Sequence, residues 1–288
     1  SCLLLLWLGL LMGCLIPINL TSLGAPTGSS GEPPSLEPLP DEKPCIPEAI
    51  AVLEENDPVG AEVYRRTGRK WFIQWIQCMD LPVELGAAVH ESVHYLSFQS
   101  RNSFSSYAFF LPSTAYTSVT RHNLYSRSEV GAYLQPEERD DYYEIYLTGK
   151  GGAQDFLVLL DEVNAYTFSL ISATNLQKFF DGTINSRDGL ATFMLYLELY
   201  LHHGRTKVEG DYRKIKNNPE YLKLIKTLWE NAENALIESA PYSHLAVDDE
   251  PKWRRVYEEA NLNELKLLYE GTGLEIGFDE RILKAYGQ

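Results

Sequence analysis

Two histidines stand four residues apart in the stretch AAVHESVHYLSF (residues 87–98), and a glutamate directly follows the first. The chain has only six histidines in 288 residues, so their close pairing needs an explanation. On a helix, residues i and i+4 lie on one face about a turn apart, so His90 and His94 can reach one ion. The pattern H-E-x-x-H is typical of zinc sites in which the glutamate, here Glu91, acts on a water molecule at the metal. The spacing therefore predicts a metal site with hydrolytic chemistry.

A helix must position these side chains, and the segment Leu81–Phe98 has the pattern of one. Its apolar residues recur at helical spacing and predict one buried face: Leu85, Val89, Val93 and Leu96. The two histidines border that face. We therefore expect them where the core meets a cleft.

The run His90-Glu91-Ser92-Val93-His94 resembles the zincin metallopeptidases. In that family the two histidines bind zinc and the glutamate is the general base. One branch, the gluzincins, takes its third ligand from a glutamate on a later helix, often in an E-x-x-A setting in which a small residue permits close helix approach. The stretch DEVNAYTF supplies that pattern with Glu162 and Ala165. The resemblance, which covers the stretch between these two motifs, implies Zn²⁺ held by His90, His94 and Glu162.

The chain departs from two patterns within this superfamily. Thermolysin-like members carry an aspartate four residues after the ligand glutamate, whereas this chain has Tyr166 there. The resemblance therefore does not identify the residue that orients His90. No third histidine follows His94 at the spacing of metzincins, which argues against that branch.

A rival third ligand is Glu129, because SEVGAYL repeats the E-x-x-A-Y order. Gly131 and Pro136 follow it and predict an extended or irregular segment. Glu162 lies in a long apolar helix pattern that can hold a carboxylate rigidly. We therefore prefer Glu162.

A zinc hydrolase also benefits from a donor that stabilises the developing oxyanion. The sequence offers several conceivable donors and does not select among them: Tyr166, Tyr95, His122, His202 and His203. For the last two, a favourable interaction with the C-terminus of a helix is the simpler interpretation.

The coarse element order is helices, a few strands, then helices. The β-rich runs cover 106–111, 115–120 and 142–147, and helix patterns cover 154–171, 189–203, the segment after Pro219, and 261–270. We predict an α+β fold with helix in the majority. The resemblance implies a zincin-like catalytic domain with a small β-sheet and a helical C-terminal half.

The N-terminal part has the composition of an export signal and a tether. Residues 1–14 contain an apolar block too short to span a bilayer comfortably, and LLMGC ends at Cys14 like a bacterial lipobox. Residues 15–43 are rich in Pro, Gly and Ser and predict a flexible tether, which leaves 44–288 as the folded domain. We expect an envelope protein whose membrane contact is a lipid anchor at Cys14; a cleaved signal with secretion, or a short anchor helix, is the alternative.

Two further features concern the compartment and the partners. Cys45 and Cys78 remain after the signal, and we predict that they form a disulfide in an oxidising compartment; two separate buried thiols are the alternative. The net charge is −15 and the sequence pI about 4.9, so nucleic acid is a poor partner.

These features together predict a zinc-dependent hydrolase of the cell envelope that acts on a peptide or protein substrate. The alternative is a non-catalytic envelope lipoprotein with a structural or partner-binding zinc site, and a third reading has no metal. An open fourth coordination position beside Glu91 distinguishes catalysis from a structural site, which a fourth protein ligand closes.

Overall fold

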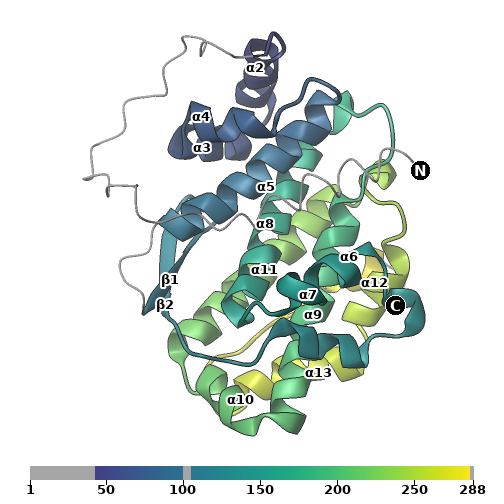
Figure 1. Cartoon of the computed structure of the whole chain (residues 1–288). Coiled ribbons are helices and arrows are strands. Elements are labelled where there is room, and N and C mark those ends of the chain that lie inside the picture. The colour runs from purple at the N-terminus through teal and green to yellow at the C-terminus, as the bar shows by residue number, and fades with distance from the viewer. Residues whose placement is uncertain (1–42, 100–104, 286–288) are drawn as a thin grey trace.

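The computed structural model describes residues 43–99 and 105–285. The predicted signal, the lipobox cysteine Cys14 and nearly all of the tether lie outside the described residues. Helices make up most of the described chain, and they surround two long neighbouring helices, α5 and α8 (Figure 1).

The N-terminal part consists of the helices α2 (Ile46–Asn56), α3 (Pro58–Thr67), α4 (Arg69–Phe72), η2 (Ile73–Trp75) and α5 (Leu81–Gln99). An antiparallel hairpin follows, formed by β1 (Ser106–Phe110) and β2 (Tyr116–Thr120), with Ser106 opposite Thr120 and Phe110 opposite Tyr116. The middle of the chain holds η3 (Arg127–Tyr133), η4 (Pro136–Glu138), α6 (Asp141–Tyr146), α7 (Gly149–Gly152), α8 (Phe156–Asn175) and η5 (Gln177–Phe179).

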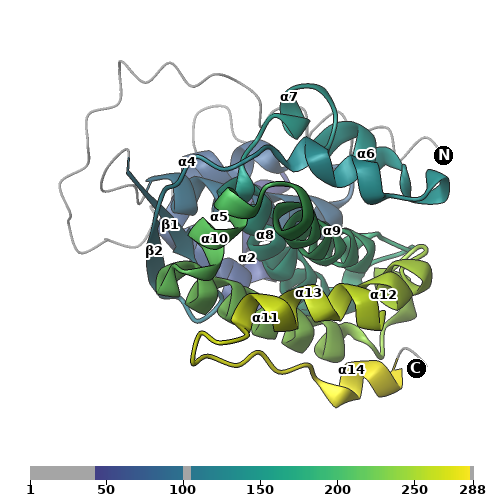
Figure 2. The same ribbon diagram turned by 90° about the horizontal axis from the view of Figure 1, so that it is seen from below.

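The regular elements in the described part of the C-terminal half are all helices. Its elements are α9 (Ser186–Lys207), α10 (Glu209–Lys216), α11 (Pro219–Ser239), η6 (Ser243–Leu245), α12 (Glu250–Val256), α13 (Glu259–Tyr269) and α14 (Glu280–Ala285). Seen from below, α9 lies in the middle, with α6 and α7 on one side and α12 and α13 on the other (Figure 2). The predicted α+β class with helix in the majority and one small sheet is confirmed.

Side-chain caps fix the starts of the two long helices. The Asp155 carboxylate accepts hydrogen bonds from the backbone N–H groups of Leu157 and Val158 and so begins α8. The Glu84 carboxylate accepts hydrogen bonds from four backbone N–H groups, those of residues 77 to 80, and holds the segment that leads into α5. That segment is also tied to the start of α2 by a Cys45–Cys78 disulfide, so the predicted pairing is confirmed.

α8 separates two apolar cores. Leu160, Val163 and Leu170 belong to the core formed with α9 and the C-terminal helices. Ala165 and Phe168 belong to the core formed with α2 to α5. α8 is long and apolar enough to cross a membrane, but 89% of its most apolar window is buried inside the protein, as expected for a core helix.

One strand prediction is wrong. The run at 142–147 belongs to the helix α6, although its tyrosines and isoleucine favour a strand. The Asp140 side chain accepts hydrogen bonds from the backbone N–H groups of Tyr142 and Tyr143, and this cap begins a helix instead. The runs at 106–111 and 115–120 do form the hairpin.

Candidate metal centre

α5 carries the two histidines on the border of its buried face. Leu85, Val89 and Val93 are fully buried, as their spacing predicted. His90 is 4% exposed, and the His94 side chain is 17% exposed. The two imidazoles therefore point away from solvent and toward α8, the next helix in the core.

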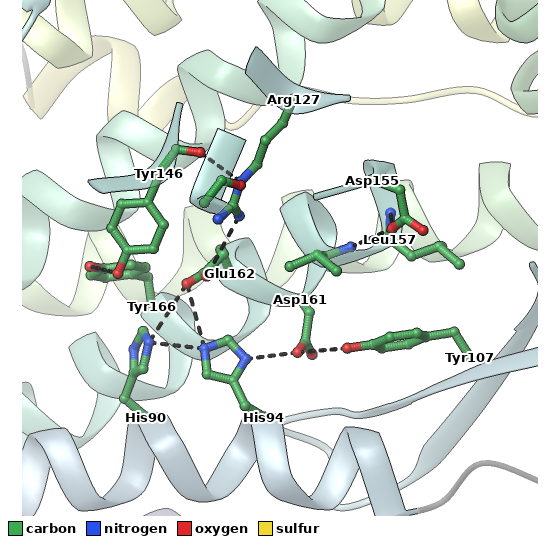
Figure 3. Close-up of polar contacts among 12 residues, drawn as sticks. His90, His94, Tyr107, Arg127, Tyr146, Asp155, Leu157, Asp161, Glu162 and Tyr166 are labelled. Atoms are coloured by element: carbon green, nitrogen blue, oxygen red, sulfur yellow. Dashed lines mark hydrogen bonds and ion pairs between the residues drawn. The ribbon is translucent and has the colours of Figure 1, made fainter. Parts of the chain in front are cut away.

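α8 runs antiparallel to α5 and brings Glu162 to the histidines. The direction follows from two contacts, because Asp161 touches His94 whereas Ser169, further along α8, touches His90. Glu162 Oε2 lies 3.5 Å from His94 Nε2 and 3.7 Å from His90 Nε2, and the two Nε2 atoms lie 3.1 Å apart (Figure 3). Ala165, one turn after Glu162, is fully buried in the core shared with α5, where its small side chain permits this close approach.

The other nitrogen of each imidazole has a partner on α8. His94 Nδ1 donates a hydrogen bond to Asp161 Oδ2 at 2.7 Å, and Tyr107 Oη on β1 donates to the same oxygen at 3.0 Å. His90 Nδ1 lies 3.1 Å from Ser169 Oγ. These contacts fix both rings with Nε2 facing inward, as the outer partners of metal-binding histidines do.

The three inward atoms fit a metal ion. They form a triangle with sides of 3.1, 3.5 and 3.7 Å. A tetrahedral ion with bonds of about 2.0–2.2 Å separates its ligand atoms by roughly 3.3–3.6 Å. Within the described residues, Glu162 Oε2 is buried without a hydrogen-bond partner, which would be costly unless a cation satisfies it. The group His90, His94 and Glu162 could therefore hold a metal ion.

Burial and the neighbouring charges shift the pKa values of all three candidate ligands. Burial and the nearby His94 lower the pKa of His90 to about 3. Burial opposes the charged form of His94 as well, but the carboxylates of Asp161 and Glu162 raise its pKa well above the usual range. Burial also opposes ionisation of Glu162, yet His94, Arg127 and His90 lower its pKa to about 2. His90 and Glu162 are thus in the states that bind metals, a neutral imidazole and a carboxylate, whereas the raised pKa of His94 means that this ring must release its proton when a metal binds.

Glu91 and two tyrosines surround the same cluster. Glu91 is 4% exposed, and its charge raises the pKa of both Tyr146 and Tyr166, after the larger effect of burial and those of nearer neighbours. The two tyrosine hydroxyls lie 3.2 Å apart, and the Tyr166 ring packs edge-on against His90 with centroids 4.6 Å apart. α9 passes this ring at Gly189, where a Cβ atom would lie 2.2 Å from Tyr166 Cε1, so only glycine fits there.

The rival ligand Glu129 lies elsewhere. Its side chain is 49% exposed, and its Oε2 is 3.8 Å from His203 Nε2 on α9. Glu129 sits in η3, a 3-10 helix, in agreement with the irregular backbone that Gly131 predicted. The structure thus brings Glu162, and not Glu129, to His90 and His94.

Of the five conceivable oxyanion donors, the structure places Tyr166 beside the cluster. Tyr95 stacks on Trp71, with ring centroids 4.0 Å apart. His122 lies 3.4 Å from the side-chain amide of Asn218. The remaining two lie near the C-terminal end of α9, where His202 Nδ1 is 2.8 Å from Glu264 Oε1 and His203 Nδ1 is 3.0 Å from Tyr133 Oη.

Four residues around the cluster were not identified from the sequence: Tyr107, Arg127, Tyr146 and Ser169. A fifth, Asp161, directly precedes Glu162, and this adjacent pair of acidic residues was a usable signal. Ser169 follows Glu162 by seven residues, two helical turns, and so shares its face. The others come from separate segments that only the tertiary fold brings together.

Comparison with known proteins adds no assignment to this geometry: no family model, no curated protein and no solved structure matches the chain.

Proposed function

We propose that this protein is a zinc-dependent hydrolase that cleaves peptide bonds. The observation that carries the proposal is the buried triangle of His90, His94 and Glu162 with Glu91 buried beside it. Each of these residues also belongs to the sequence pattern that resembles the gluzincin metallopeptidases. Geometry and motif therefore support the same chemistry independently.

The donor set supports zinc as the ion. Two imidazole nitrogens and one carboxylate oxygen are the ligands of well-known catalytic zinc sites, and such sites keep one position open. Purely oxygen-liganded sites suit magnesium or calcium instead. Within the part of the chain that the structure describes, the cluster comprises three ligand groups. This number favours a catalytic site over a structural one, which uses four protein ligands.

Glu91 and the two tyrosines would have different roles in the reaction. A bound zinc ion would lower the pKa of a water molecule to about 7 and polarise the substrate carbonyl. Glu91 accepts the proton of the attacking water and later donates it to the leaving amine. Of the two hydroxyl protons of Tyr146 and Tyr166, their mutual hydrogen bond uses one. The other can be donated to the oxyanion that develops on the substrate.

An exported location is part of the proposal. The Cys45–Cys78 disulfide supports it, because disulfides persist in oxidising compartments. The lipobox pattern at Cys14 suggests attachment to the bacterial envelope. The peptide nature of the substrate rests on the resemblance to metallopeptidases, since the same machinery hydrolyses other amides.

The second candidate is a non-catalytic envelope protein with a structural zinc site. The low exposure of the cluster favours it, because His90 is 4% and Glu162 7% exposed. Against it stands Glu91, a buried carboxylate that a purely structural site does not need.

The test is metal dependence of cleavage. The purified chain should cleave members of a diverse peptide library, lose that activity on dialysis against a chelator and regain it with one equivalent of zinc. His90→Ala should bind zinc weakly and show no activity under the same conditions. Cleavage that persists without metal would contradict the proposal. Zinc binding without any cleavage would favour the structural alternative.

A further inference from the structure

Arg127 at the start of η3 is a buried cation next to the candidate metal centre. Its side chain is 4% exposed. Its Nε atom donates hydrogen bonds to the backbone carbonyls of Tyr146 at 2.8 Å and Gly151 at 3.0 Å. These two bonds tie η3 to α6 and α7, and they fix the orientation of the guanidinium plane.

The opposite side of the guanidinium faces Glu162. Arg127 Nη1 lies 3.6 Å from Glu162 Oε1 and, within the described residues, has no hydrogen-bond partner. Glu162 Oε2 points the other way, toward His90 and His94. The two oxygens of the Glu162 carboxylate therefore have different neighbours: Oε1 faces Arg127, and Oε2 faces the two imidazoles (Figure 3).

We propose that Arg127 is a positioning residue of the metal centre, which holds Glu162 Oε1 so that Glu162 binds the ion through Oε2 alone. The inference rests on the proposed function and extends it. A guanidinium is well suited to this role because it stays charged when buried and its planar donors match a carboxylate. If Glu162 used both oxygens, a bound ion would gain an additional protein ligand atom and its coordination number would rise.

The same side chain also contacts Tyr146, one of the two candidate hydroxyl donors of the proposed reaction. The guanidinium carbon lies 5.2 Å from the centre of the Tyr146 ring, in addition to the bond to the Tyr146 carbonyl. Arg127 thus sets the positions of Tyr146 and Glu162 relative to each other. A loss of Arg127 should affect the ligand and the donor together.

The test compares zinc affinity and coordination number in matched variants of the full chain. Arg127→Gln keeps an N–H donor for the two carbonyls but removes the charge beside Glu162. Arg127→Lys keeps the charge. The control is Arg187→Gln, because Arg187 is equally buried but is bonded to Asp249 and to the Ser239 carbonyl, none of which belongs to the metal centre. Zinc affinity is measured by competition with a chromophoric chelator, and coordination by the visible absorption of bound Co²⁺, which weakens as coordination number rises.

We expect Arg127→Gln to lower zinc affinity about 10- to 100-fold, the range typical of residues that orient metal ligands. Its Co²⁺ absorption should weaken as Glu162 becomes bidentate. Arg127→Lys keeps the charge but not the planar donors, so its zinc affinity should lie between those of wild type and Arg127→Gln. If the glutamine variant does not fold, Arg127→Lys is compared with the wild type alone: a lower affinity with a weaker Co²⁺ absorption supports the inference, and wild-type values of both overturn it. Arg187→Gln should lose thermal stability but keep the wild-type affinity and spectrum.

Two results would overturn the inference. Unchanged zinc affinity and Co²⁺ spectrum in Arg127→Gln would show that Arg127 only supports the fold, and an equal loss in Arg187→Gln would show a general effect of stability. Both leave the proposed function intact. Failure of the wild-type chain to bind either ion would instead overturn the proposed function, and this inference with it.

Discussion

His90 and His94 face each other through their Nε2 atoms, which lie 3.1 Å apart. Each ring is held in this orientation from behind, His94 by a carboxylate on α8 and His90 by a serine hydroxyl. Two ring nitrogens brought this close need a positive charge between them or a proton on one of them. A metal ion bound also by Glu162 Oε2 would meet that need.

The first prediction concerns the third ligand. Glu162→Ala should lower zinc affinity by more than about 100-fold, beyond the range for residues that only orient ligands. Glu129→Ala is the matched control and should keep about one zinc per chain, because Glu129 lies beside His203 and is half exposed. Metal analysis of both purified variants checks this. Loss of zinc from the Glu129 variant with retention in the Glu162 variant would contradict the assignment.

A second prediction concerns the carboxylate behind His94. Asp161→Asn removes the negative charge that accepts the His94 Nδ1 proton and should weaken zinc binding about 10- to 100-fold. Asp188→Asn provides the control, since Asp188 is also buried but accepts hydrogen bonds from the backbone N–H groups of Val247 and Asp248. Equal zinc affinities in the two variants would show that Asp161 does not act on the metal centre.

The disulfide gives a third prediction. Cys45 and Cys78 are 33 residues apart, and closing a loop of that length stabilises a fold by about 4 kcal/mol in the chain-entropy model. Replacing both cysteines by serine should therefore lower the free energy of unfolding by roughly 2–5 kcal/mol. Denaturant unfolding of oxidised wild type and the double variant measures the difference. A change below about 1 kcal/mol would mean that Glu84 and the apolar core hold this segment without the bridge.

A fourth prediction concerns the pH dependence of stability. Glu198 on α9 is fully buried, and within the described residues neither of its carboxylate oxygens has a hydrogen-bond partner. Burial raises the pKa of Glu198 well above 4.5; the nearby Arg255 opposes this shift, and the acidic side chains of Glu264 and Glu258 add to it. The folded chain then keeps a proton that the unfolded chain loses as the pH rises above 4.5. The contribution of Glu198 to the free energy of unfolding should therefore fall as the pH increases through this range.

The variant Glu198→Gln isolates this effect. Its amide carries no titratable proton, so the variant should match the wild type near pH 4 and exceed its stability increasingly toward neutral pH. Thermal unfolding at a series of pH values, with zinc saturating throughout, provides the comparison. A stability difference that does not change with pH would rule out titration of Glu198.

The sequence was informative where local spacing decides the structure. The spacing of the apolar residues predicted a helix at 81–98, and the i, i+4 spacing of the histidines predicted that both lie on one face of it. The helix α5 confirms this. The long apolar pattern around Glu162 correctly predicted a rigid core helix, α8. Both helices depend on contacts within a few turns, and the spacing of apolar residues along the sequence reflects such contacts directly.

The sequence was uninformative where distant segments meet. SEVGAYL offers Glu129 as a candidate ligand, yet the residue that this region brings to the site is Arg127, two positions before Glu129. The aromatic residues around Tyr146 favour a strand, but the Asp140 cap begins the helix α6 there. In this helix the Tyr146 hydroxyl lies beside the Tyr166 hydroxyl. A single sequence records neither the tertiary contacts of a buried arginine nor the effect of one capping residue on a neighbouring segment.

The central claim is that this site hydrolyses peptides with Glu91 as the general base, and one comparison tests it most directly. The measurement is the rate of peptide-library cleavage by wild type and Glu91→Gln, each loaded with one zinc per chain. Glutamine is nearly isosteric with glutamate and leaves the three ligands in place, but its amide cannot accept the proton of water. We expect equal zinc content in the two proteins and a cleavage rate lower by about 10²–10⁴-fold in Glu91→Gln. Equal cleavage rates in the two zinc-loaded proteins would contradict the claim.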